Sequence, residues 1–188
     1  MSKAGTCSTS GEKGNDPLSP YLLRTKLYIP PIRPDQIARP RLVDQINGGL
    51  DKTLILVSAP AGYGKTTLVS SWLSARKVPS AWLSLDAGDN DPVRFLQYLL
   101  ASLLPAAPGI EHDLLGTIQG IRPAQFENLI TLLVNEMASN PDPFVLVLDD
   151  FHVIHSEEVL RIVSFLLEHL PHQVHLAVLT RTDPPLPL

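Results

Sequence analysis

The stretch Leu54-Ile55-Leu56-Val57-Ser58-Ala59-Pro60-Ala61-Gly62-Tyr63-Gly64-Lys65-Thr66-Thr67-Leu68 decides how the rest of the chain folds. Four strand-forming residues run into a turn of small residues, and an apolar-periodic segment follows. A strand, then a glycine-containing loop, then a helix is the pattern of a phosphate-binding loop. Small residues let the backbone curl until several N–H groups point at one anion. The following helix adds the positive end of its dipole.

The side chains that close the loop suit a metal–triphosphate. Lys65 carries a compact charge for the β- and γ-phosphates, Thr66 offers a hydroxyl to Mg²⁺, and Thr67 can donate to the α-phosphate. The strict pattern has glycine where this chain has Ala59, so we expect negative φ there and the sharp turns at later glycines. The alternative is an ordinary glycine-rich turn with an exposed lysine. The candidate loop residues are Ala59, Pro60, Ala61, Gly62, Tyr63, Gly64, Lys65, Thr66 and Thr67.

A second candidate segment is the apolar run 144–148, which ends in Asp149 and Asp150. Ligands of open α/β sheets bind at the carboxyl ends of the strands, so these carboxylates are expected to face the phosphate loop. Asp149 is suited to the Mg²⁺ shell that Thr66 helps to form. Asp150 is suited to orient or deprotonate an attacking water. The alternative is that both acids are ordinary turn residues.

A further candidate is Arg181, which follows the apolar run 175–179 and Thr180. An arginine at this strand end could reach the γ-phosphate and assist catalysis. The alternative, a surface arginine that opens a loop, stays open at this point.

Bulk composition places the chain among globular proteins. It has 188 residues, 44% hydrophobic and 18% charged, with a net charge of −4. No strongly basic part indicates a nucleic-acid surface, and no apolar run reaches the length of a membrane span. The single cysteine, Cys7, excludes a disulfide within the chain and favours a reducing cytoplasm.

Hydrophobic periodicity predicts an α/β fold with a parallel sheet covered on both faces, because short apolar strands alternate with helical segments. The expected domains are a disordered leader (1–19), an extended segment with a short helix (20–52) and a phosphate-binding core (53–188). The stretch 105–120 is left unassigned, and residues 21–34 are expected to be extended. Expected strands cover 54–58, 80–85, 144–148 and 175–179; expected helices begin near residues 40, 65, 92, 123 and 157.

Taken together, these motifs resemble the ATPase domain of STAND-class P-loop NTPases, relatives of AAA+ proteins. The family most similar is the large ATP-dependent LuxR-type (MalT-like) transcription regulators. The resemblance runs from about Tyr21 to Leu188. It rests on segments 25–31, 39–42, 59–67, 81–92, 146–152 and 180–188.

The resemblance implies more than the composition does. It implies that ATP with Mg²⁺ sets the active, self-associated state, with slow hydrolysis and an inducer or partner protein that biases the switch. It implies adenine and ribose contacts around 39–41, and so assigns Arg41 to the nucleotide. The implied sheet is of the additional-strand class, with the fourth strand between the first and third. The chain is expected to stop before a fifth strand, helical and winged-helix subdomains, sensor repeats and a DNA-binding helix-turn-helix.

The sequence leaves two alternative functions open. One is a P-loop enzyme that works by turnover, such as a kinase or a DNA-remodelling ATPase, although no arginine cluster indicates a kinase lid. The other is an interaction module without nucleotide chemistry, which the intact Lys65, Thr66, Asp149 and Asp150 disfavour.

Overall fold

The computed structural model describes residues 22–32, 37–107, 118 and 120–186. The leader 1–19, with Cys7, lies outside the described residues, as do 108–117 and 119 of the unassigned stretch. Within the described part, no helix combines the length and the apolar character needed to cross a membrane.

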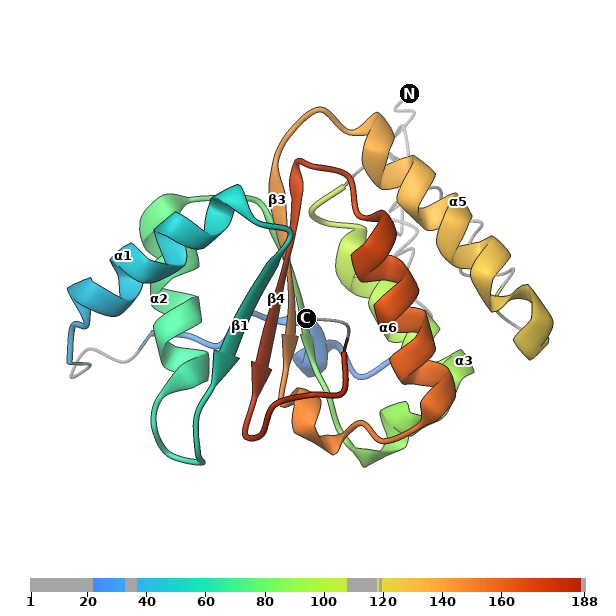
Figure 1. Ribbon diagram of the computed structural model, residues 1–188, viewed down its shortest axis with the longest axis horizontal. Helices are drawn as coiled ribbons and strands as arrows, with labels where there is room; N and C mark the ends of the chain where they lie inside the picture. The colour runs from blue at the N-terminus through green and yellow to red at the C-terminus, as the bar shows by residue number, and fades with distance from the viewer. Residues whose placement is uncertain (1–21, 33–36, 108–117, 119, 187–188) are drawn as a thin grey trace, which may run out of the picture.

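A parallel sheet of four strands forms the centre of the molecule (Figure 1). The strands are β1 (Leu54–Ser58), β2 (Ser80–Ser84), β3 (Phe144–Asp149) and β4 (Val174–Thr180). Their order is β1-β4-β3-β2, so the fourth strand lies between the first and the third. This order, which the family resemblance implied, is confirmed.

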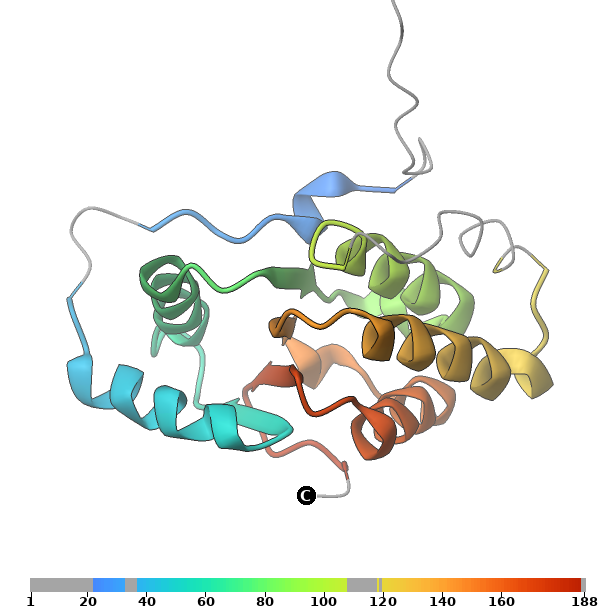
Figure 2. The ribbon, with the colours of Figure 1, turned by 90° about the horizontal axis from the view of Figure 1, so that it is seen from above.

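Helices cover both faces of the sheet, which confirms the three-layer α/β/α class (Figure 2). One layer holds α1 (Pro40–Gly48) and α2 (Lys65–Arg76). The other holds α3 (Pro92–Leu103), α5 (Phe126–Ser139) and α6 (Glu157–His169). Short 3₁₀ turns connect them: η2 (Gly49–Asp51), η3 (Ala87–Asn90), η4 (Pro123–Gln125) and η5 (Phe151–Val153). The fifth expected helix thus begins as a 3₁₀ turn at Pro123 and becomes α-helical at Phe126.

Strand alternation divides the interior into two cores. Leu146 and Leu148 of β3 face the layer of α3, α5 and α6, whereas Val145 and Val147 face α1 and α2. Side chains of a strand point alternately to opposite faces, so an unbroken apolar strand can fill both cores at once. All of β3 is buried as a result.

The expectation that 21–34 is simply extended is wrong, because Arg24–Leu27 forms the 3₁₀ helix η1. The turn brings Lys26, only 5% exposed, into ion pairs with Asp86 and Asp89. Its ammonium also lies 4.2 Å from the centre of the Tyr98 ring. Long-range pairing of a buried charge overrides the local preference, since an unpaired buried ammonium is costly.

Candidate nucleotide-binding site

The loop between β1 and α2 turns at its two glycines. Gly62 has φ +81° and Gly64 has φ +78°, values that side-chain-bearing residues rarely adopt. Among the described residues, the only non-glycine residues with positive φ are Lys77 and Asp150. Ala59 therefore keeps the negative φ expected of it, and its substitution for glycine leaves the loop geometry intact.

The two sequence motifs meet at a side-chain contact between α2 and β3. The Thr66 hydroxyl lies 2.9 Å from Oδ2 and 3.2 Å from Oδ1 of Asp149. Asp149 is 4% exposed, and its Oδ1 also accepts the N–H of Asp150 at 2.9 Å. A buried carboxylate beside a hydroxyl is a hard-oxygen donor set of the kind that Mg²⁺ prefers, so these residues fit the metal.

The electrostatics of Asp149 suit a cation site. Burial raises the pKa of Asp149, and the negative charge of Asp150 raises it further. The hydrogen bonds from the Thr66 hydroxyl and the Asp150 N–H, and the positive charge of Lys65, lower this pKa but do not cancel the effect of burial. Burial disfavours the ionised form when no full counter-charge touches it. A divalent cation at this carboxylate would reverse that balance.

Lys65 lies at the start of α2 with 9% of its surface exposed. Its ammonium donates to the carbonyl oxygens of Ala59 and Pro60, at 2.7 and 3.3 Å. The side chain therefore curls back over the loop that precedes it, and its positive charge lies within the concave turn. An anion held by the loop N–H groups would meet this charge.

Asp150 occupies the sharp turn between β3 and η5. Its φ of +57° is uncommon for a residue other than glycine, although Asp tolerates it better than most. The side chain is 46% exposed, in contrast to buried Asp149. The adjacent acids thus have different surroundings: one is fixed among donors and the other faces solvent.

Arg181 follows β4 immediately and is exposed. The N–H of Ala59 donates to the carbonyl of Thr180 at 3.2 Å, which ties the start of the phosphate loop to the residue before Arg181. The loop, the acid pair and Arg181 follow the carboxyl ends of β1, β3 and β4, which are parallel, so they share one end of the sheet.

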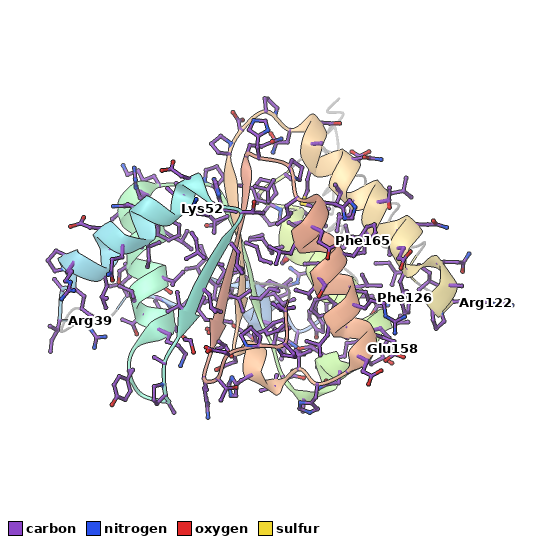
Figure 3. The ribbon with its side chains drawn as sticks, in the orientation of Figure 1. Arg39, Lys52, Arg122, Phe126, Glu158 and Phe165 are labelled. Atoms are coloured by element: carbon purple, nitrogen blue, oxygen red, sulfur yellow. The ribbon has the colours of Figure 1, made fainter. Side chains whose placement is uncertain are left out.

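Arg39, which the sequence analysis did not single out, is the arginine that touches the loop. Its Nη1 donates to the Tyr63 carbonyl at 2.8 Å, and a Cβ on Gly64 would meet its Nη2 at 3.8 Å. Arg39 lines a pocket of about 420 Å³ between α1, β1 and the loop, whereas Arg41 is exposed and does not line it. Figure 3 shows Arg39 at the end of α1 remote from Lys52. A signal was present: Arg39 precedes Pro40 at the N-cap position of α1, and its side chain makes no capping bond there, so its guanidinium can reach the loop.

With this geometry in place, the chain is shown to belong to the AAA ATPase domain family, which matches residues 33–179. It is 38% identical over 165 residues to the HTH-type transcriptional regulator MalT of Cronobacter sakazakii. The corresponding protein of Vibrio cholerae is 37% identical over 166 residues. These alignments cover 88% and 86% of this chain but 18% of each relative, so the chain spans under a fifth of the regulators it resembles.

Among solved structures, Drosophila ORC bound to AT-rich DNA and Cdc6 matches at a TM-score of 0.49 and 16% identity. That match covers 76% of this chain and 46% of the other. The fold class assigned above comes from the sheet order, the layers and the loop.

Proposed function

We propose that this chain is an ATP-binding switch module with slow Mg²⁺-dependent hydrolysis, part of a signal-responsive transcription regulator. The observation that carries the proposal is the contact of the Thr66 hydroxyl with the Asp149 carboxylate at 2.9 Å, between two residues that are 83 positions apart in the sequence. It joins the phosphate loop to the acid pair at one edge of the sheet. Membership of the AAA ATPase domain family supports nucleotide binding by this site.

Each residue has a role in the proposal. The N–H groups of residues 61–64 hold the phosphates, Lys65 neutralises the β- and γ-phosphates, and Thr67 donates to the α-phosphate. Thr66 and Asp149 hold Mg²⁺, which supplies charge neutralisation at the transferring phosphoryl group. The pocket lined by Arg39 lies beside the loop, and we assign the base and ribose to it. Arg41 is kept as a proposed nucleotide contact, although it is exposed and does not line that pocket.

Hydrolysis is assigned to Asp150 and Arg181. The half-exposed Asp150 carboxylate can accept a proton from a water that attacks the γ-phosphate. Arg181 contributes positive charge to the developing transition state.

The regulatory role rests on the relatives named as HTH-type transcriptional regulators. In the proposal, ATP occupancy controls self-association in the cytoplasm, and an inducer or partner protein biases it through a sensor region. DNA is bound by a helix-turn-helix outside these 188 residues. The net charge of −4 agrees with a module that does not itself bind DNA.

The proposal is tested by binding and turnover of the wild-type protein and of Asp150→Asn. We expect Mg·ATP at a hundredfold excess over its Kd to stabilise both proteins by about 2.7 kcal/mol. Only the wild type should release phosphate, because the amide cannot take the proton of water. Asp142→Asn, which changes an exposed acid just before β3, is the matched control.

Three results would contradict the proposal. If Mg·ATP left the unfolding of the wild type unchanged, the chain would be an interaction module without nucleotide chemistry. Turnover at the rates of kinases, roughly 1–100 s⁻¹, would favour an enzyme over a switch. Phosphate release by Asp150→Asn at the wild-type rate would remove Asp150 from its assigned role.

A further inference from the structure

A shallow apolar groove lies between α5 and α6, in the helical layer on the far side of the sheet from α1 and α2 (Figure 2). Phe126 and Ile130 of α5 and Ile162 of α6 form its floor and are 5%, 1% and 5% exposed. The half-buried Phe165 of α6 forms one wall (Figure 3). The cavity in this α5–α6 groove measures about 40 Å³, far below the roughly 300–1,000 Å³ of sites for free small molecules. It therefore fits a side chain presented by a larger surface.

The wall of the groove is held in place by its own helix. The ring of His169, one turn further along α6, stacks on Phe165 with 4.2 Å between the ring centres. The Nδ1 atom of His169 lies 2.8 Å from the Phe165 carbonyl oxygen, and this contact fixes the stacked ring in turn. Because the floor is buried and the wall is fixed, the groove is formed before anything binds to it. Binding to a preformed groove avoids the entropy cost of ordering it.

The rim of the groove is acidic. Glu127 of α5 and Glu158 of α6 line it from opposite sides, and both are exposed. Together α5 and α6 carry five glutamates against one basic residue, Arg161. The 14 acids and the 14 lysines and arginines elsewhere in the sequence cancel, so these two helices account for the whole net charge of −4. None of their six charged side chains makes an ion pair with a described residue.

We propose that the α5–α6 groove is the docking site for a basic amphipathic helix of a partner protein. Two helices that lie side by side leave a furrow into which the side-chain ridge of a third helix fits. The apolar stripe of the partner helix packs between Phe126 and Phe165, and the lysines or arginines beside that stripe meet Glu127 and Glu158. The acidic rim repels nucleic acids and anionic membranes, so neither is the occupant.

A second copy of this chain is a poorer occupant than a partner protein. The described helices pack their apolar residues against the sheet, so a second copy presents no free basic amphipathic helix from this part of the chain. The groove also lies across the sheet from α1 and from the pocket beside the phosphate loop (Figure 1). A partner in the groove therefore leaves the nucleotide pocket open, and the inference does not depend on ATP binding.

The test measures, by fluorescence anisotropy, how the full chain binds a synthetic helical peptide with leucine on one face and lysine on the other. One matched peptide has glutamate in place of lysine, and another has the leucines and lysines in scrambled order. We expect only the ordered leucine–lysine peptide to bind. Glu127→Lys with Glu158→Lys should raise its Kd about tenfold or more, because like charges then meet across the interface.

The control variant combines Glu136→Lys with Glu157→Lys. It makes the same change of charge on the same two helices, but neither residue lines the groove. At an ionic strength of about 0.15 M, charges that do not touch the peptide are largely screened. The control should therefore change the Kd for the leucine–lysine peptide by less than about threefold.

Phe165→Ala tests the apolar part of the groove. We expect it to raise the Kd for the leucine–lysine peptide about tenfold, since truncating an aromatic residue at the centre of an interface has a large effect. Phe165→Leu keeps an apolar wall and should retain most of the affinity. Melting temperatures show whether each variant is folded. If Phe165→Ala does not fold, the two pairs of charge reversals decide alone.

Other patterns of binding would overturn the proposal. Equal losses of affinity in the groove variant and the control variant would mean diffuse attraction to an acidic surface. Equal binding of all three peptides, or of none, would mean that the groove does not select a basic amphipathic helix. If sedimentation shows that the wild type self-associates and that Glu127→Lys with Glu158→Lys does not, the occupant is a second copy. All of this is measured without nucleotide, so a negative result leaves the proposed function standing.

Discussion

Lys65 illustrates what a single side chain contributes to this site. Its ammonium, bonded to the Ala59 and Pro60 carbonyls, places a full positive charge inside the turn of the loop. The glycines leave room for the backbone to curl, but they supply only partial charges. In the proposed function, this lysine would therefore supply most of the loop's attraction for a triphosphate.

Lys65→Ala should abolish nucleotide binding. We expect the stabilisation of about 2.7 kcal/mol, given by Mg·ATP at a hundredfold excess over the wild-type Kd, to disappear. Thermal unfolding with and without Mg·ATP measures this. Lys52→Ala is the control, because Lys52 is exposed and lies just before β1, at the amino end of the strands and so at the opposite end of the sheet from the loop (Figure 3). Equal nucleotide shifts in both variants would contradict the role of Lys65.

The burial of Asp149 leads to a prediction of how the free energy of unfolding depends on pH in the absence of nucleotide. Burial raises the pKa of Asp149 above 3.8, so the fold favours the protonated acid. The stabilisation that comes from protonated Asp149 is complete at pH values below its pKa in the unfolded chain. This stabilisation is lost as the pH rises through the pKa of Asp149 in the folded protein. At pH 7 the ionised carboxylate therefore weakens the fold. We expect Asp149→Asn to raise the free energy of unfolding at pH 7 and to lose this gain near pH 3.

Urea unfolding at the two pH values, with EDTA present, measures the effect. The same variant should show a smaller shift with Mg·ATP, since an amide is a poorer Mg²⁺ ligand than a carboxylate. Asp142→Asn should be neutral in both assays, because Asp142 is exposed. A less stable Asp149→Asn at pH 7 would show that its hydrogen bonds outweigh the cost of burying its charge.

Residue types at the site could be predicted from sequence, but their contacts could not. A glycine-containing loop before a helix and an acid pair after a strand are local patterns, visible in neighbouring residues. The 2.9 Å contact of Thr66 with Asp149 spans the sheet and depends on how β1 and β3 are placed. Arg39 was missed for the same reason: its bond to the Tyr63 carbonyl depends on where α1 packs.

Among the elements, η1 shows how a short turn is held in place by distant partners. Lys26 pairs with Asp86 at 2.9 Å and with Asp89, which is fully buried. Arg94 of α3 donates to the same two acids, and the Asp86 N–H donates to Asp89 at 2.7 Å. The network joins the N-terminal segment, the loop after β2 and α3.

Lys26→Met should lower the free energy of unfolding by about 3 kcal/mol. The methionine keeps most of the volume but leaves Asp89 buried with only Arg94 as counter-charge, and removing one partner of a buried pair costs several kcal/mol. Urea denaturation measures the loss, with Lys52→Met as the exposed control.

Asp89→Asn combined with Lys26→Met extends that experiment. The double variant should lose less than the sum of the single variants, because the two side chains share one interaction. Additive losses, or a loss below about 0.5 kcal/mol for Lys26→Met, the range of an ordinary surface substitution, would mean that η1 is not anchored by this network.

For the whole molecule, the sheet order determines where stability is greatest. β3 and β4 occupy the centre of the sheet, with helices on both faces, whereas β1 and β2 each have one unpaired edge among the described residues. In contrast, α1 contributes only one buried residue, Ile46. Local opening costs least where few apolar contacts are lost.

Amide hydrogen exchange should reflect this gradient. We expect the amides of β3, at 145–148, to exchange slowest and near the rate of global unfolding, and those of α1 to exchange faster by several orders of magnitude. Mass spectrometry of peptides from a time course resolves the two segments. Mg·ATP should slow exchange in the phosphate loop and in η5 more than in α5, which is remote from the site. Equal protection of α1 and β3 would contradict a stability gradient set by the sheet.

The chain's local patterns were enough to predict the strands, the helices and the turn of the loop at its glycines. Apolar runs of strand length, small residues in a turn and acids at a strand end express preferences that act within a few residues. Packing over long distances was needed for the rest: the turn at η1, the arginine that contacts the loop and the pairing of Thr66 with Asp149. The physical reason is that buried charges and unpaired polar atoms cost more than local preferences do, so partners far apart in the chain choose the final geometry.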